Sequence, residues 1–260
     1  MSEPPGPSAV EAFGGRGIAL SLAGGEGHSW RVGDLVLKPW EDPVGWTWLG
    51  EHLPTVREDG FRLALPVPAT DGRWVVDGWC AQTWVAGSHP VEPRWIDVLT
   101  TCDRLHRAFA HLPHPAFVDA RTNPWSVGDR VAWGEADSPV EHPFMDRLLA
   151  VRRHVDLSSQ VIHGDLTENV LFADPMSPAV IDPTVYWRPP GFANAIVVGD
   201  AIRCSGADPA PLLAATARIR GFPQLFVRAV IARLVTTLLF DRRDVSYFEG
   251  DVRLAVELAG

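Results

Sequence analysis

Two short segments decide the fold of this 260-residue chain: VIHGDLTENVLF at residues 161–172 and AVID at residues 179–182. Each begins with apolar residues typical of a buried strand. Asp165 follows the first apolar run, Asn169 opens the next, and Asp182 ends the third. Strand ends hold side chains rigidly, so an amide oxygen and a carboxylate placed there can share a hard cation such as Mg²⁺. Asp165 is then left to orient and deprotonate a hydroxyl group.

A glycine-rich loop precedes the only lysine of the chain. Lys38 is the single lysine among 23 basic residues, and it ends the short apolar run LVLK. Gly24, Gly25 and Gly27 lie in the loop before it. Lysine is a compact point charge that reaches phosphate oxygens, whereas the planar guanidinium of arginine does not fit the same space. The glycines by themselves are a weak signal, and their order with the lysine is what makes them informative.

Together these segments resemble the motifs of the aminoglycoside phosphotransferase and choline kinase-like superfamily. The family motif begins His-Gly-Asp, ends in Asn and is followed by Ile-Asp, which here are residues 163–165, Asn169 and residues 181–182. The resemblance implies an α+β, two-lobe protein kinase-like fold with an antiparallel β small lobe and a mainly helical large lobe. It also implies Mg²⁺-dependent transfer of a phosphoryl group from ATP to a hydroxyl of a small molecule.

The same resemblance implies a nucleotide site in the first half of the chain. The three glycines and Lys38 would position the phosphates of ATP. A glutamate on the following helix would hold the lysine, with Glu51 as the candidate and Glu58 as the alternative. The adenine is expected to meet backbone groups at a hinge around Gln82 to Trp84.

The catalytic side of the site comes from the second half. Asp165 would act on the acceptor hydroxyl, and Asn169 and Asp182 would hold Mg²⁺. His163 and Asp200 are expected to support the catalytic loop without taking part in the chemistry.

The sequence departs from the family in the catalytic loop. Three residues, 166–168, separate Asp165 from Asn169, where the usual kinase pattern has four. A shorter loop must reach the same metal by a different backbone path. A second function therefore stays open, that of a nucleotide-binding pseudokinase or regulatory protein without transfer activity.

Local patterns divide the chain. Residues 1–17 are expected to form a tail, 18–87 a β-rich nucleotide-binding lobe, and 88–260 a helical lobe with the catalytic segment at 161–183. Short apolar runs between turn residues predict strands at 18–22, 35–38, 63–65 and 73–79. Apolar residues spaced by three and four predict helices at 43–56, 95–112, 143–155 and 223–240.

Composition excludes several classes of function. The formal net charge of −9 argues against nucleic acids and anionic membranes as partners. Cys80, Cys102 and Cys204 are far apart and form no CxxC motif, which predicts neither a disulfide framework nor a zinc site. With no uninterrupted apolar run of about 18 residues, the protein is expected in the cytoplasm. The acidic balance would tolerate a cationic acceptor, but charge alone does not choose one.

Overall fold

The chain divides into two compact units. The computed structural model describes residues 3–22, 28–40, 42–242 and 244–260. As far as they are described, Met1–Val91 and Glu168–Pro183 form unit 1, and Glu92–Thr167 and Thr184–Gly260 form unit 2. Unit 1 thus takes up residues 168–183, which we expected in the helical lobe.

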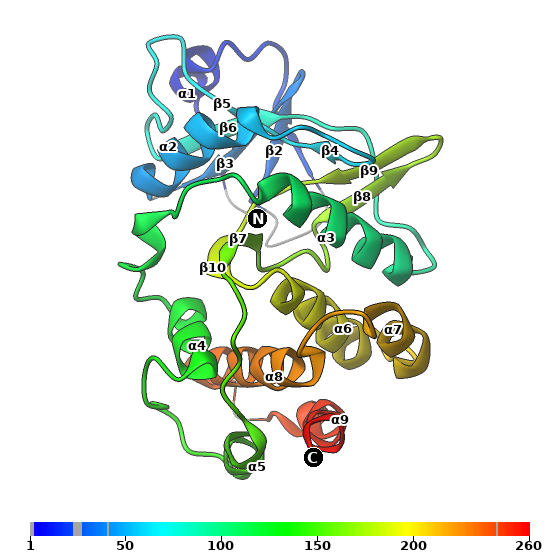
Figure 1. Cartoon of the computed structure of the whole chain (residues 1–260). Coiled ribbons are helices and arrows are strands. Elements are labelled where there is room, and N and C mark those ends of the chain that lie inside the picture. The colour runs from blue at the N-terminus through cyan, green and yellow to red at the C-terminus, as the bar shows by residue number, and fades with distance from the viewer. Residues whose placement is uncertain (1–2, 23–27, 41, 243) are drawn as a thin grey trace. The chain divides into compact units, whose positions relative to one another are not determined.

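A five-stranded antiparallel sheet forms the framework of unit 1 (Figure 1). Its strands, in spatial order, are β1 (Leu20–Ser21), β2 (Trp30–Val32), β3 (Leu35–Pro39), β6 (Trp79–Thr83) and β5 (Pro66–Val67). Val32, Leu37 and Ala81 from the three central strands pack with Phe13, which follows helix α1 (Pro7–Ala12). Because β3 is paired on both edges, the backbone that carries Lys38 is fixed by two neighbours.

Two turns of this sheet have glycines in the left-handed backbone conformation. Val32 pairs with Leu35, so Gly33 and Asp34 form a two-residue hairpin turn, with φ of 62° at Gly33. The strand predicted at 73–79 is wrong. Asp77 and Gly78 have φ of 51° and 76°, and these two consecutive left-handed residues reverse the chain before β6 begins.

Helix α2 (Pro43–His52) begins and ends at sequence signals. The Asp42 carboxylate accepts hydrogen bonds from the backbone N–H groups of Val44 and Gly45, which caps the first turn. A 3₁₀ helix (Leu53–Thr55) follows, with a proline at its second position. The helix buries Trp46 and Leu49 on one face.

A second, three-stranded sheet brings residues 168–183 into unit 1. Its order is β4 (Arg62–Leu63), β9 (Met176–Val180) and β8 (Val170–Ala173). The pairing of β4 with β9 is parallel, and the Arg62 side chain donates to the carbonyls of Ser177 and Ala86 at 2.8 Å each. Backbone pairing therefore fixes the β8–β9 hairpin to the N-terminal segment.

Unit 2 is mainly helical, as predicted. Helices α3, α5 and α8 confirm the predicted periodic segments, whereas α4, α6, α7, α9 and strand β10 were not predicted. The helices are α3 (Trp95–Phe109), α4 (Pro124–Trp133), α5 (Pro143–Val151), α6 (Gly191–Ser205), α7 (Pro209–Thr216), α8 (Phe222–Leu239) and α9 (Glu249–Ala259), with 3₁₀ turns at Ala116–Val118 and Ser246–Phe248. Strands β7 (Gln160–His163) and β10 (Val185–Arg188) form an antiparallel pair.

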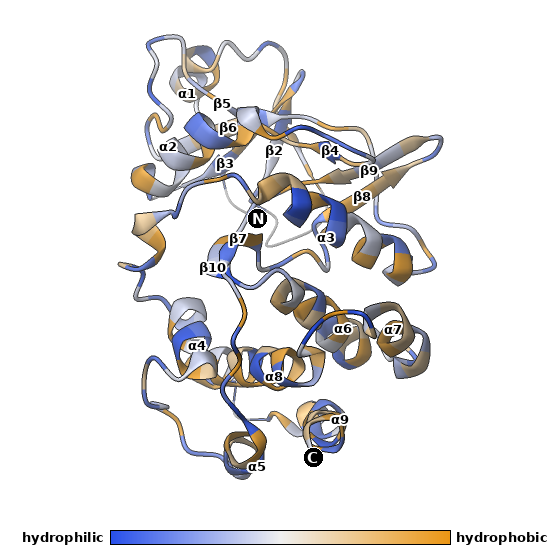
Figure 2. Cartoon of the chain, in the orientation of Figure 1, coloured by the Kyte–Doolittle hydropathy of each residue, from blue (hydrophilic) through white to orange (hydrophobic). Residues whose placement is uncertain are grey.

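Helix α8 is the central helix of unit 2. It is long and apolar enough to cross a membrane by composition alone, but 61% of its 18 residues are buried within the protein. It packs against α4, α5, α6 and α9. Figure 2 shows polar positions among the apolar ones of this helix. Its sequence includes Arg228 and Arg233. An arginine in such a helix requires a partner.

Candidate active site

Lys38 and Asp182 form an ion pair inside unit 1. Lys38 is 8% exposed on β3, and its ammonium lies 5.5 Å from the centre of the Trp46 ring. The Gln82 amide donates to Asp182 Oδ1 at 3.1 Å. Charges act over short distances with little screening when they are buried. The arrangement concentrates one cation and one amide donor on a single carboxylate.

The register of the β8–β9 hairpin brings Asn169 next to Asp182. Val170 pairs with Val180, and beyond this pair the Ile181 N–H donates to the carbonyl of Asn169 at 3.0 Å. Asp182 follows with φ of 51°. An aspartate tolerates this left-handed conformation better than most residues. The amide and the carboxylate thus sit at one end of one hairpin, although 12 residues separate them on the chain.

These donors fit Mg²⁺. A carboxylate and an amide supply hard oxygen ligands, and Mg²⁺ commonly takes one or two protein ligands and completes its shell with water and phosphate. The side chain of Asp182 is 37% exposed, so it can reach a ligand from solvent. Among the described residues, no group of three or more His, Cys, Asp and Glu could hold a metal ion by itself. The donor set suits a metal that arrives with a nucleotide.

The glutamate expected to hold Lys38 does not do so in the part of the chain that is described. Glu51 is exposed on α2, and the Glu58 carboxylate accepts the backbone N–H of Leu63 at 2.6 Å. Trp46 occupies the α2 position beside Lys38. Residues five apart on a helix point about 140° away from each other. With Trp46 facing inward, Glu51 therefore faces solvent. Lys38 forms its ion pair with Asp182 instead.

The expected adenine contacts also need correction. Gln82 lies within β6, where its backbone pairs with Val36 and Pro66, and its side chain turns to Asp182. The Trp84 N–H donates to the carbonyl of Asp34 at 2.8 Å. Neither residue therefore offers its backbone N–H to a base. The loop glycines, Gly24, Gly25 and Gly27, lie outside the described residues.

Asp165 belongs to an ion-pair network within unit 2. Arg233 Nη2 lies 2.7 Å from Asp165 Oδ1 and 2.7 Å from Asp200 Oδ2. The Thr167 hydroxyl donates to Asp200 at 3.0 Å, and Arg203 pairs with the same carboxylate. Burial by itself raises the pKa of Asp200, but Arg233 and Arg203 outweigh it and the pKa lies below its ordinary value. Asp200 thus joins the loop at residues 165–167 to α8.

Arg233 was not among the candidates from the sequence. Its side chain is 12% exposed, in an apolar helix 68 residues from Asp165. The signal was present, because a charged residue within an apolar helical pattern is almost never buried without a partner. The sequence could not show which carboxylate the partner is.

His163 is buried at the end of β7 and shapes the turn that carries Asp165. Its Nδ1 accepts the backbone N–H of Asp165 at 3.1 Å. The backbone N–H of His163 donates to Nε2 of His106 at 2.9 Å. An added Cβ on Gly164 would meet the Tyr186 ring at 2.5 Å, so only glycine fits at this position beside the ring. His106 is a second support that sequence analysis missed.

Acid is expected to destabilise the protein through His106. Burial, with a smaller effect of His163, lowers the pKa of His106 to about 3. Since the unfolded pKa is about 6.5, the unfolded chain binds the proton first, and the loss reaches about 2 kcal/mol at pH 5. Urea unfolding at pH 7 and pH 5 measures it. The loss of unfolding free energy between pH 7 and pH 5 should shrink in His106→Gln. It should persist in His114→Gln, which replaces a half-exposed histidine. An equal loss in all three proteins would contradict the assignment.

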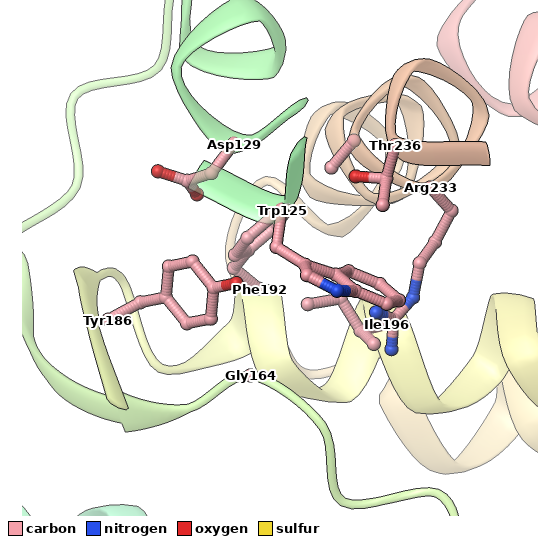
Figure 3. A pocket seen from close by; sticks show the side chains of 9 residues that line it. Trp125, Asp129, Gly164, Tyr186, Phe192, Ile196, Arg233 and Thr236 are labelled. Atoms are coloured by element: carbon pink, nitrogen blue, oxygen red, sulfur yellow. The ribbon is translucent and has the colours of Figure 1, made fainter. Parts of the chain in front are cut away.

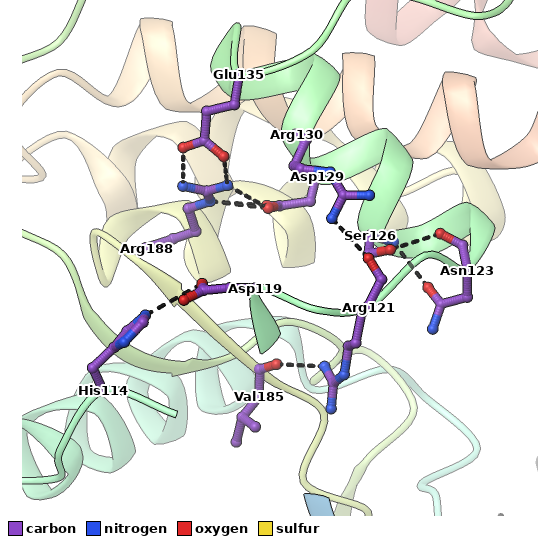
Figure 4. A network of polar contacts seen from close by, with 10 residues as sticks. All are labelled: His114, Asp119, Arg121, Asn123, Ser126, Asp129, Arg130, Glu135, Val185 and Arg188. Carbon is purple, nitrogen blue, oxygen red and sulfur yellow. Dashed lines mark hydrogen bonds and ion pairs between the residues drawn. The ribbon is translucent and has the colours of Figure 1, made fainter. Parts of the chain in front are cut away.

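A polar network flanks this site in unit 2 (Figure 4). Arg188 bridges Asp129 and Glu135, with contacts as short as 2.6 Å to each. Arg121 donates to the carbonyl of Val185 at 2.8 Å. The network ties α4 to β10, because Asp129 lies on the former and Arg188 on the latter.

Comparison with known proteins identifies the fold. No protein-family model and no curated protein matches the sequence. The apo form of a thermostable mutant of aminoglycoside phosphotransferase APH(4)-Ia aligns with a TM-score of 0.65 and 14% identity, covering 95% of this chain and 97% of that one. Spectinomycin phosphotransferase APH(9)-Ia, in complex with ADP and spectinomycin, aligns with a TM-score of 0.61 and 12% identity, covering 92% and 93%. An aminoglycoside phosphotransferase from Alicyclobacillus acidocaldarius aligns with a TM-score of 0.58 and 17% identity, covering 100% and 93%.

The chain therefore has the α+β, two-lobe kinase-like fold of the aminoglycoside phosphotransferases. The resemblance of the sequence motifs to this superfamily is confirmed at the level of the fold. A fold hosts many activities, so the function must be argued from the side chains of the site.

Proposed function

We propose that the protein transfers the γ-phosphoryl group of ATP to a hydroxyl of a small molecule, in a reaction that requires Mg²⁺. The observation that carries this proposal is the cluster at the end of the β8–β9 hairpin, where Lys38 pairs with Asp182 and Asn169 adjoins them. The fold supports it, because structures with this fold were solved with ADP and with AMP-PNP.

Unit 1 would bind the phosphates and the metal. On nucleotide binding, Lys38 would exchange Asp182 for phosphate oxygens, which frees the carboxylate to hold Mg²⁺ together with Asn169. Bound Mg²⁺ supplies charge neutralisation at the phosphates. Gln82 would keep Asp182 oriented through its amide hydrogen bond. Because Lys38 is buried, its charge would act on the phosphates with little screening.

The segment after β6 would bind the adenine. Trp84 uses its N–H within unit 1. The N–H groups of Val85 and Ala86, in contrast, donate no hydrogen bond to any described residue. We therefore move the expected adenine contact from Gln82 and Trp84 to Val85 and Ala86.

Asp165 would act on the acceptor. Its carboxylate would accept a hydrogen bond from the acceptor hydroxyl and take its proton as the new O–P bond forms. The bond between the γ-phosphorus and the β,γ-bridging oxygen breaks, and ADP leaves. Arg233, paired with both Asp165 and Asp200, would hold the carboxylate in one orientation.

The acceptor would be a small molecule, and the enzyme would act in the cytoplasm, where ATP is available. Structures of APH(4)-Ia and APH(9)-Ia were solved with hygromycin B and spectinomycin, respectively. Those compounds are ligands of those proteins. The identity of the acceptor here has to come from the surroundings of Asp165.

The shortened catalytic loop favours one alternative. With three residues between Asp165 and Asn169, the chain could bind nucleotide without transferring phosphate. Such a pseudokinase would share the nucleotide site and lack acceptor-dependent ADP release. Turnover in a screen of hydroxylated compounds distinguishes the two functions.

ATP with Mg²⁺ is expected to raise the melting temperature. A ligand at 100 times its Kd stabilises a protein by about 2.7 kcal/mol, which corresponds to about 5–10 °C for a chain of this size. Differential scanning fluorimetry measures the shift. It should depend on Mg²⁺ and disappear in Lys38→Met, and it should be unchanged in Arg73→Lys, where the arginine is exposed. If no nucleotide shifts the melting temperature, both functions are wrong.

A further inference from the structure

Two exposed aromatic side chains in unit 2 are connected to Asp165 through one arginine. Trp125 is 43% exposed and Phe240 is 50% exposed, and their ring centroids lie 6.0 Å apart. The Arg233 guanidinium lies 5.1 Å from the centre of the Trp125 ring and donates to Asp165. One arginine therefore links this aromatic pair to the carboxylate that would orient the acceptor.

The space beneath Trp125 is too small for an acceptor ring. A cavity of about 20 Å³ lies there, lined among others by Gly164, Tyr186 and Thr236 (Figure 3). A cavity of that size holds one water-sized group. An acceptor ring would have to lie outside it, on the exposed parts of Trp125 and Phe240.

Asp129, which lines this cavity, already holds an arginine, and so do Glu135 and Asp200 in the surrounding network. Both oxygens of Asp129 and both oxygens of Glu135 accept hydrogen bonds from Arg188 (Figure 4). Both oxygens of Asp200 accept from Arg233. An amino sugar needs carboxylates that can accept its ammonium groups. At Asp129, Glu135 and Asp200, internal guanidinium groups have taken those positions.

A face of the Trp125 ring is also occupied by an internal arginine. An ammonium ligand gains affinity when it lies over a tryptophan ring. Arg233 already lies over the Trp125 ring, so it takes the place that a ligand cation would occupy on that face. The exposed parts of the Trp125 and Phe240 rings suit contact with an apolar face of a ligand.

We infer that the acceptor is an uncharged hydroxylated ring compound whose apolar face stacks on Trp125 and Phe240. This inference rests on the proposed function and specifies its substrate class. It also separates this chain from the aminoglycoside complexes of its structural neighbours, since the compounds of that class carry amino groups. The net charge of the whole chain, −9, does not decide the matter, because the groups next to Asp165 are internally paired.

A matched pair of probes tests the inference. Phenyl β-D-glucoside and phenyl 2-amino-2-deoxy-β-D-glucoside differ at one position of the ring, where the second carries an amino group. Titration of the full-length protein, followed by ligand-observed NMR, gives the Kd of each. We expect the neutral glucoside to bind at least about tenfold more tightly, and Trp125→Ala to weaken it by about tenfold. Tyr247→Ala, an aromatic residue 48% exposed elsewhere in unit 2, is the matched control and should change neither Kd.

Trp125→Phe keeps an aromatic ring and should retain most of the affinity, which separates loss of stacking from loss of folding. Equal or tighter binding of the amino glucoside, full affinity in Trp125→Ala, or no binding of either probe would overturn the inference. The ATP-dependent rise in melting temperature, measured on the same samples, tests the proposed function independently. Its absence would contradict that function, whereas its presence with failed probe binding would contradict only the acceptor class.

Discussion

Replacing Asp165 by asparagine is expected to lower kcat for acceptor-dependent ADP release by about 10³-fold, within the range of about 10²–10⁴ for a positioned proton acceptor. Asparagine retains an oxygen that can accept from Arg233, but it cannot take the hydroxyl proton. Arg233 also keeps Asp200 as a partner, so the fold should survive. A coupled assay of ADP release measures the effect.

The residues proposed to bind the nucleotide, Lys38 and Asp182, belong to unit 1, whereas Asp165 belongs to unit 2. The Asp165→Asn protein should therefore keep the ATP-dependent rise in melting temperature. Asp119→Asn is the matched control, since that carboxylate is exposed and, among the described residues, pairs with His114 alone, at 3.4 Å. It should keep full activity. Retained turnover in Asp165→Asn would remove this residue from the chemistry.

Lys38→Arg is expected to lower kcat/KM by about 10²-fold or more, comparable to the loss of one preorganised donor in an active site. The charge is conserved, but the guanidinium is larger and planar. Lys38 is packed against Trp46 and beside Asp182, where the added volume displaces both the cation and the carboxylate. Steady-state kinetics with varied ATP measures the loss.

Arg73→Lys supplies the reverse substitution in the same unit. Arg73 is 60% exposed and pairs only with neighbouring Asp71 among the described residues, so its replacement should leave kcat/KM within about twofold. A Lys38→Arg enzyme with normal kinetics would show that this position requires only a positive charge. It would also remove the physical reason for a single lysine in an arginine-rich chain.

Local patterns predicted those parts of the fold that depend on neighbours in sequence. The periodic segments became α3, α5 and α8, and the glycine at 33 marked a hairpin turn. The strand predicted at 73–79 failed, because the turn at Asp77 and Gly78 reverses the chain there. An apolar run can be a strand on either side of a turn, and only pairing decides which.

The candidate site was predictable in its residue types and less so in its contacts. Glu51 lies on the predicted helix that follows the lysine, but the face on which α2 packs turns Trp46 toward Lys38. Gln82 was expected at a hinge and instead donates to Asp182 from within β6. Helix rotation and strand length are set by packing, which a local pattern does not contain.

The sequence by itself determined the order of the motifs, the lone lysine and the strand-end placement of Asp165, Asn169 and Asp182. These features are local, because strand alternation and turn chemistry act over a few residues. Only the tertiary structure decided that Lys38 pairs with Asp182, 144 residues away, and that Arg233 pairs with Asp165. Such pairs form because a buried charge must find an opposite charge, and the partner is whichever one the packed backbone brings within reach.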